Sequence, residues 1–213
     1  MITSEQWLNT FKEYNTDYLP VLILKWLVLI IVLVLYFVKQ NKSTGIFLKL
    51  SLAFAFFWNG VVFFFSYMKS SLFIGGIPML LVSTLFVIDI FRHKLEFKLS
   101  DVKWKRNLTL FMFIYATVLY TFAGWLLGYR YPGGPILLAP CPLTIFTIVL
   151  MSQVESIKNN RLFYLLHFVG LLWWSFASGI TAPLAFGFYL DFTLLATGIF
   201  GLIVLIKKMI QKN

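Results

Sequence analysis

The sequence predicts an all-α fold: a polytopic membrane helix bundle that forms one integral membrane domain over residues 1–213. Three observations support this prediction: the chain is 60% hydrophobic, only 12% of its residues are charged, and its mean hydropathy is +0.86. An average soluble domain is about half apolar and about a quarter charged. No segment is polar enough to form a separate soluble domain, so we expect the whole chain to belong to the membrane.

Seven apolar segments are each long enough to cross the roughly 30 Å hydrocarbon core of a bilayer, which takes about 20 helical residues. We expect transmembrane helices at Leu19–Val38, Ile46–Met68, Leu72–Phe91, Leu108–Gly128, Ile136–Val154, Leu162–Ala182 and Phe188–Ile206. An odd number of spans places the two termini on opposite sides of the membrane.

The distribution of Lys and Arg predicts the orientation of these spans. One side carries only Lys12, Lys69 and Arg130 in its connections. The other side carries Lys39, Lys42, Arg92, Lys94, Lys98, Lys103, Lys105, Arg106, Lys158, Arg161, Lys207, Lys208 and Lys212. Because basic connections stay in the cytoplasm, the N-terminus is expected outside and the C-terminus in the cytoplasm. The net charge of +10 then predicts contact with anionic lipid headgroups rather than with nucleic acid.

Two segments outside the spans have their own patterns. In residues 1–18, Thr3 and Gln6 match a capping box. One helical face of this segment carries the aromatic residues Trp7, Phe11 and Tyr14. We expect an amphipathic helix at the outer membrane surface, with a frayed terminal tail as the alternative. Residues 92–107 form the longest connection and predict a basic cytoplasmic loop on the inner headgroup surface.

The fifth span contains the sequence Pro140-Cys141-Pro142. Proline removes a backbone donor and clashes with the preceding turn, so the span is expected to break there and to restart with Pro142 at its first position. A helix from Pro142 to Val154 would reach only about 20 Å, too short to cross a bilayer. The break is therefore expected inside the membrane, where irregular backbone is tolerated only against protein or a water-filled cavity.

A ligand site is expected at this break, in the outer half of the bundle. The candidate ligand-binding residues are Tyr129, Arg130, Tyr131, Cys141, Thr144 and Asp191. Cys141 and the backbone N–H groups near Thr144 would contact the ligand. Arg130 and Asp191 would balance charge at a mouth walled by the two tyrosines. The alternative is a structural ion pair of Asp191 with Arg130 or Lys25 that joins two spans.

Other polar residues lie inside the predicted spans, where a charge costs about 2.5–3.5 kcal/mol on insertion scales. They are Lys25, Lys49, Asn59, Asp89 and His167. Lys25 is expected to extend outward, and Asn59 to bond to a neighbouring helix. Lys49 and Asp89 would pair on the inner side. His167 beside them would relay protons or serve as a hydrogen-bonded structural residue.

The sixth span carries a stripe of polar and small residues on one helical face. The stripe consists of His167, Gly170, Trp174, Ser178 and Thr181. Such a face lines a water-filled path or allows close packing of helices, and the sequence favours neither interpretation.

No catalytic residue, cofactor site or metal site is expected. Cys141 and His167 could form a nucleophile and its base, but their expected depths in the membrane differ by roughly 15 Å. The chain has no HExxH motif, nucleophile elbow or phosphate-binding loop. Enzymatic activity is therefore the weakest of the hypotheses.

Five segments spread over the chain carry a resemblance to known proteins. They are Ser4–Asn15, Trp58–Phe63, Gly128–Pro132, Pro140–Thr147 and Leu190–Phe192. The pairing of Arg-Tyr-Pro with Pro-Cys-Pro-x-Thr-Ile-Phe-Thr is the most specific part. On these motifs the chain resembles an uncharacterised family of small bacterial membrane proteins, a domain of unknown function that is sometimes labelled a permease. The resemblance implies a multi-pass protein of the bacterial cytoplasmic (inner) membrane and brings no catalytic residues.

Together, these patterns predict an integral membrane protein that binds or transports a small solute or ion at the broken fifth helix. One alternative is a non-catalytic accessory or assembly subunit of the membrane. A further alternative is a membrane-embedded enzyme that uses the Cys141 thiolate. The substrate, the coupling ion, the direction of transport and the oligomeric state are left open.

Overall fold

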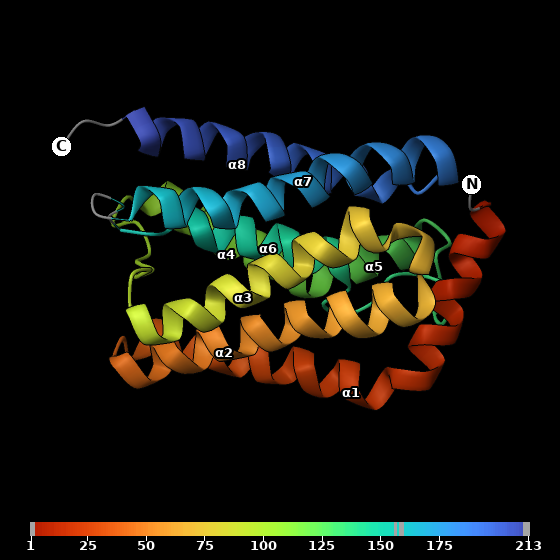
Figure 1. Cartoon of the computed structure of the whole chain (residues 1–213), viewed down its shortest axis with the longest axis horizontal. Helices are drawn as coiled ribbons and strands as arrows, with labels where there is room; N and C mark the ends of the chain where they lie inside the picture. Colours follow the sequence, from red (N-terminus) through yellow and green to blue (C-terminus); the bar gives the residue numbers. More distant parts are fainter. Residues whose placement is uncertain (1–2, 156, 158–159, 211–213) are drawn as a thin grey trace.

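The chain folds into an all-α bundle (Figure 1) in a computed structural model that describes residues 3–155, 157 and 160–210. Within these residues the only β-pairing is an isolated bridge between Phe97 and Val154. The α-helices are α1 (Ser4–Val38), α2 (Lys42–Trp58), α3 (Ile77–Arg92), α4 (Lys103–Ile114), α5 (Tyr120–Leu126), α6 (Pro140–Ser152), α7 (Arg161–Phe186) and α8 (Phe192–Ile210). The predicted fold class is confirmed.

Several helices are continued by tighter or wider turns. A π-helical segment, Asn59–Tyr67, extends α2, and another, Tyr115–Leu119, joins α4 to α5. Short turns at Lys69–Ser71 and Leu72–Gly76 lead into α3, and Tyr189–Asp191 leads into α8. Counted with these extensions, six helices of the described chain are long and apolar enough to cross a membrane.

The long helices run along the longest axis of the molecule, and their connections gather at two ends (Figure 1). We call the end with the C-terminus and the connections after α1, α3 and α6 the basic end, and the other the N-terminal end. The connections at the basic end carry most of the described lysines and arginines, in the alternating pattern expected from the sequence. Lys158 and Lys212 lie outside the described residues. The orientation in a membrane stays a prediction.

The exterior of the bundle is apolar. Side chains such as Leu24, Phe91 and Leu184 are 62%, 79% and 75% exposed on the outward faces of α1, α3 and α7. A soluble monomer rarely shows apolar surface over all its helices, whereas lipid tails are a suitable neighbour for it. The span-length helices and this exterior together indicate a multi-pass membrane protein.

The first helix has two parts. Its first half crosses the N-terminal end of the bundle and its second half runs along the other helices (Figure 1), with Pro20 inside the helix. The capping box of Thr3 and Gln6 is confirmed. The expected aromatic face also forms, but it is buried against protein: Trp7, Phe11 and Tyr14 are at most 6% exposed. The location of this segment at the membrane surface stays a prediction.

The fifth apolar segment differs from its predicted form. The expected helix over Ile136–Val154 is instead α6, which begins at Pro140, and the chain from 128 to 139 is not helical. Ala139 caps the helix, so both prolines lie in its first turn. Proline is tolerated there because the first N–H groups of a helix need no intrahelical acceptor. The predicted break at Pro140-Cys141-Pro142, with the helix restarting at Pro142, is therefore wrong.

The short α6 helix forms the centre of the bundle. Every side chain from Pro140 to Met151 is buried, and the helix packs against α4, α7 and α8. Its 13 residues are too few to cross a bilayer alone. The structure thus has six helices of spanning length and one half-length core helix among its described residues, while the prediction of seven complete spans is not confirmed.

Candidate functional site

The buried Asp191 carboxylate is the centre of the best candidate site. Asp191 has no exposed surface and accepts hydrogen bonds from three side chains on three different helices. The donors are the Tyr120 hydroxyl on α5, the Ser178 hydroxyl on α7 at 3.0 Å and the Cys141 thiol on α6 at 3.2 Å. The thiol also lies 3.6 Å from the Ser178 hydroxyl. We call these four residues the Asp191 cluster.

The connection between α7 and α8 brings Asp191 to this position. Gly187 ends α7 with a φ of 70°, a left-handed conformation that glycine adopts without strain. The chain then reverses, so that Asp191 returns to the face of α7 that carries Ser178. Beside it, a Cβ on Gly179 would lie 2.8 Å from the Leu195 backbone nitrogen. Glycine at this position therefore allows the close approach of α7 and α8 that the cluster requires.

No cation pairs with Asp191 among the described residues. Its three donors are neutral groups, and the two ion pairs of the described chain lie elsewhere. A carboxylate in a low-dielectric interior is stabilised by taking up a proton or a cation. The cluster therefore contains a carboxylate whose charge a proton or a small cation would neutralise.

A second buried polar group, the Lys25 amine, contacts the non-helical chain just before α6. The Lys25 amine donates to the Asn59 side-chain oxygen and to the Leu138 carbonyl, both at 3.3 Å. The Asn59 amide donates to the same carbonyl at 3.0 Å. Lys25 is only 4% exposed, so the predicted outward extension of its side chain is wrong. The expected bond from Asn59 goes to the non-helical chain rather than to a helix.

Residues 132–142 contain four of the seven prolines, and we call them the proline-rich segment. This segment links a buried amine to a buried carboxylate. Leu138 accepts from Lys25, and Cys141, three residues later, donates to Asp191. The segment is held in place by the Thr121 hydroxyl, which accepts from the Leu137 N–H at 3.2 Å. Neither Lys25 nor Asp191 has an ion-pair partner among the described residues. Buried groups of this kind in a membrane bundle are candidates for function.

The structure brings together only two of the six predicted ligand residues, Cys141 and Asp191. Arg130 is exposed and lies over the Trp125 ring at 5.8 Å. Its predicted pairing with Asp191 does not form, because Arg130 lies on the surface whereas Asp191 is buried and bonds to Tyr120, Cys141 and Ser178. Tyr131 is 50% exposed. Thr144 is buried and donates to the Pro140 carbonyl at 2.8 Å, within its own helix.

The remaining predicted residue, Tyr129, fastens the chain turn near the cluster. Its hydroxyl donates to the Gly187 carbonyl at 2.6 Å, and its ring packs on Phe188 at 4.4 Å. Burial raises the pKa of the Tyr129 hydroxyl, which keeps it protonated as a donor. The Tyr129 hydroxyl therefore bonds to the connection that carries Asp191, and its predicted contact with a ligand stays a prediction.

Two members of the cluster are missing from the predicted ligand residues. Ser178 belongs to the polar stripe on the sixth span, so its inward orientation was signalled by helical spacing. The sequence around Tyr120 does not indicate a polar contact, because a tyrosine in an apolar span usually packs in the core. Only the tertiary structure shows that its hydroxyl meets a carboxylate.

The polar residues at the basic end form a separate group. Lys49 and Asp89 make a buried ion pair at 2.7 Å, as predicted. Asp89 also accepts from the backbone N–H groups of Lys94 at 2.8 Å and Leu95 at 3.2 Å. His167 lies close by: its Nδ1 is 2.9 Å from the Phe163 carbonyl, and its Nε2 has no hydrogen-bond partner in the described chain. Among all the described residues, no group of three His, Cys, Asp or Glu side chains could hold a metal ion.

Comparisons with known proteins show the family and no activity. No curated protein and no solved structure matches the chain. The model of a family of unknown function, DUF6064, matches residues 4–213. This match covers almost the whole chain, including the helices and the proline-rich segment that form the Asp191 cluster. The chain therefore belongs to the DUF6064 family.

Proposed function

We propose that this protein binds or transports a small ion or solute across a membrane, and that the Asp191 cluster is its site for a proton or a small cation. One observation carries the proposal: in the described chain, a fully buried carboxylate is held by neutral donors from three helices and by no cation. A purely structural aspartate would be expected to have a cation beside it, as Asp89 has Lys49.

The surroundings of the cluster support an exchange role. Discontinuous helices in transporters often bind ions where irregular backbone meets a helix end. Here α6 begins at Pro140, directly before Cys141, and is buried along its length. The hydroxyl oxygens of Tyr120 and Ser178 could turn from donating to Asp191 to contacting a cation bound there.

The first half of α1 would act as the outer cover of this site. The Asn15 amide donates to the carbonyls of Pro132 and Gly134, both at 2.7 Å. At the other end of the cover, Trp7 stacks on Phe186 with 5.5 Å between ring centroids. The cover therefore contacts both the proline-rich segment and the end of α7, and we expect it to move when the cluster exchanges its ion.

The test is ion flux into liposomes that contain the purified protein and a trapped pH dye. A proton gradient, a sodium gradient and a potassium diffusion potential are applied in turn. We expect Asp191→Asn to abolish the flux, because the neutral amide cannot take up a proton or balance the charge of a bound cation. Cys141→Ser keeps a donor at the same position and should retain flux.

The matched control is Asp101→Asn, which makes the same change at an exposed aspartate. Flux in Asp191→Asn equal to that of the wild type would contradict the proposed site. A folded wild type without flux under any gradient would favour an accessory or assembly subunit. Loss of a function in Cys141→Ser alone would favour thiol chemistry, which the burial of Cys141 at 4% exposure disfavours.

A further inference from the structure

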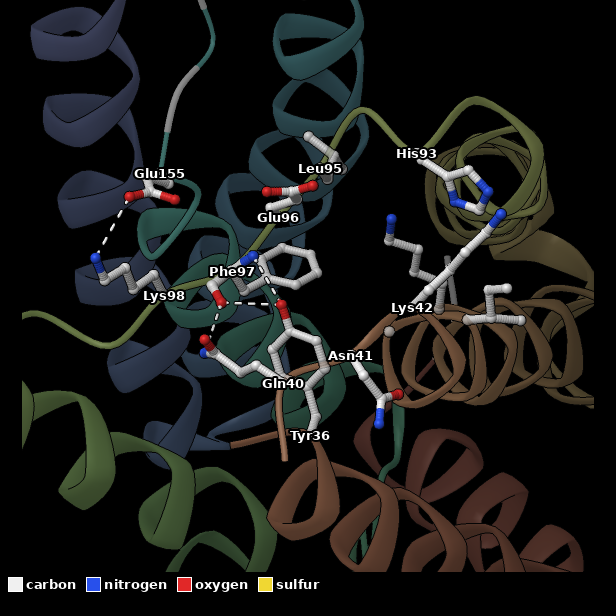
Figure 2. Close-up of a pocket in the computed structure, with 13 residues that line it drawn as sticks. Tyr36, Gln40, Asn41, Lys42, His93, Leu95, Glu96, Phe97, Lys98 and Glu155 are labelled. Carbon is white, nitrogen blue, oxygen red and sulfur yellow. Dashed lines mark hydrogen bonds and ion pairs between the residues drawn. The ribbon is translucent and has the colours of Figure 1, made fainter. Parts of the chain in front are cut away.

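A polar pocket at the basic end carries no assigned role. It has a volume of about 480 Å³ and lies between the end of α1, the start of α2 and residues 93–98 (Figure 2). None of its lining residues belongs to the Asp191 cluster. It is therefore a second candidate site, at the opposite end of the molecule.

The floor of this pocket is anchored to the bundle. The buried Tyr36 hydroxyl donates to the Phe97 carbonyl at 2.9 Å and accepts from the Phe97 N–H at 3.1 Å (Figure 2). The Gln40 amide donates to the same carbonyl at 3.3 Å. The chain at Phe97 is pinned from the other side, where the Lys98 N–H donates to the Gln153 carbonyl at 2.8 Å. The pocket is thus built on ordered backbone.

Two of the lysines that line the pocket are already neutralised. Lys49 pairs with Asp89 at 2.7 Å, and Lys98 pairs with Glu155 at 3.5 Å. Three titratable side chains on the pocket wall have no partner among the described residues: Lys42, His93 and Glu96. Their charges and donors are the groups available to a ligand.

These three groups give the pocket one side with a basic residue and the imidazole, Lys42 and His93, and one acidic residue, Glu96. In the view of Figure 2, Lys42 and His93 lie on one side of the pocket, and Glu96 lies toward the Lys98–Glu155 pair. Lys42 is the first residue of α2, so the positive end of the helix dipole also lies on its side. The backbone of Glu96 is held by its carbonyl, which accepts from the Glu155 N–H at 2.9 Å.

We propose that this pocket binds a zwitterionic group with a phosphate and a primary amine, such as a phosphoethanolamine headgroup. The phosphate would lie against Lys42 and His93, and the amine would donate to Glu96. A simple anion would be repelled by Glu96 and would leave this carboxylate without a partner. A simple cation would be repelled by Lys42 and would leave this amine without a partner. The basic end is the part of the bundle expected at the inner headgroup layer, so a membrane lipid is one source of this group and a free solute is the other.

The test is lipid binding to the intact, detergent-purified protein, measured by native mass spectrometry. The probes are phosphatidylethanolamine, phosphatidylglycerol and phosphatidylcholine with identical acyl chains. We expect phosphatidylethanolamine to bind about tenfold more tightly than the other two, because only its amine can form a charge-assisted hydrogen bond with Glu96. Glu96→Gln should remove this preference, and Lys42→Gln should weaken all three lipids.

Two exposed residues of the basic end that do not line the pocket provide matched controls. Lys39→Gln and Asp101→Asn change the same charges and should leave the lipid preference unaltered. Soluble glycerophosphoethanolamine separates the two sources: if it displaces the lipid at equal concentration, the ligand is a solute, and if it does not, the ligand is a lipid. Equal binding of the three lipids and no binding of the soluble headgroup would overturn the proposal. A preference that persists in Glu96→Gln would do so as well.

Discussion

Two buried aspartates of this bundle are held in opposite ways. Asp89 at the basic end has no exposed surface and binds a lysine and two backbone N–H groups. Asp191 is equally buried, but among the residues that the structure describes it accepts only from a phenol, a hydroxyl and a thiol. Asp89 is thus fully compensated, whereas Asp191 has hydrogen bonds without a compensating charge. Burial alone therefore does not distinguish the two carboxylates, whereas the charge of their partners in the described chain does.

The largest effect is expected from breaking the compensated site. Lys49→Met leaves the Asp89 carboxylate buried without its cation, which typically costs about 3–5 kcal/mol. The free energy of unfolding in detergent, measured by denaturant titration, should fall by this amount. The exposed Lys39→Met is the control and should change little.

A double variant sharpens this first prediction. Lys49→Met with Asp89→Asn removes both charges and keeps an oxygen that accepts from the Lys94 and Leu95 N–H groups. We expect it to recover most of the lost stability. If the single variant is as stable as the wild type, the ion pair does not hold the basic end together.

A smaller loss is expected at the uncompensated site. Asp191→Asn keeps one acceptor oxygen and leaves no cation unpaired, so it should cost on the order of 1–3 kcal/mol. The same denaturant titration measures it. A loss as large as that of Lys49→Met would indicate that Asp191 is charged and has a partner, and would remove the contrast between the two sites.

Removing one donor from Asp191 should have a still smaller effect. Ser178→Ala deletes one of three hydrogen bonds and should cost about 0.5–1.5 kcal/mol. Thr181→Ala on the same helix is the control, because within the described chain that exposed hydroxyl bonds only to the Ala177 carbonyl of its own helix. Equal losses in the two variants would mean that the bond from Ser178 to Asp191 adds nothing.

The smallest effect concerns the thiol of the cluster. Cys141 is 4% exposed and donates to Asp191, so a membrane-impermeant maleimide should not label it in intact cells. Labelling should appear only after denaturation, and mass spectrometry measures it. The positive control is Arg130→Cys in a Cys141→Ser background, which places a thiol on the exposed part of the same connection. Rapid labelling of native Cys141 would instead reveal an open path to the cluster.

Local sequence patterns were enough to predict most of the helices. Long apolar segments predict them because burial of backbone polar groups in lipid requires helices. The capping box of Thr3 and Gln6 could also be read directly, since it depends on residues only three positions apart. The Lys49–Asp89 pair was predictable because two opposite charges at the same depth of a membrane have few other partners.

The composition of the Asp191 cluster could not be predicted in this way. Its donors lie 71, 50 and 13 residues before Asp191 in the chain. Which of them meet depends on the reversal at Gly187 and on where α6 begins. The sequence favoured Arg130 as the partner because of its charge and approximate depth, but the helices place it on the exposed surface instead.

By itself, the sequence determined an all-α bundle of apolar helices, its basic connections and the special character of the proline-rich segment. These properties follow from the local composition and periodicity of the chain. The tertiary structure alone decided that α6 is a half-length core helix, that the first half of α1 covers the N-terminal end, and that Asp191 has neutral partners. Those features depend on packing between segments far apart in the chain, and the protein interior allows only the polar contacts that this packing brings within hydrogen-bond distance.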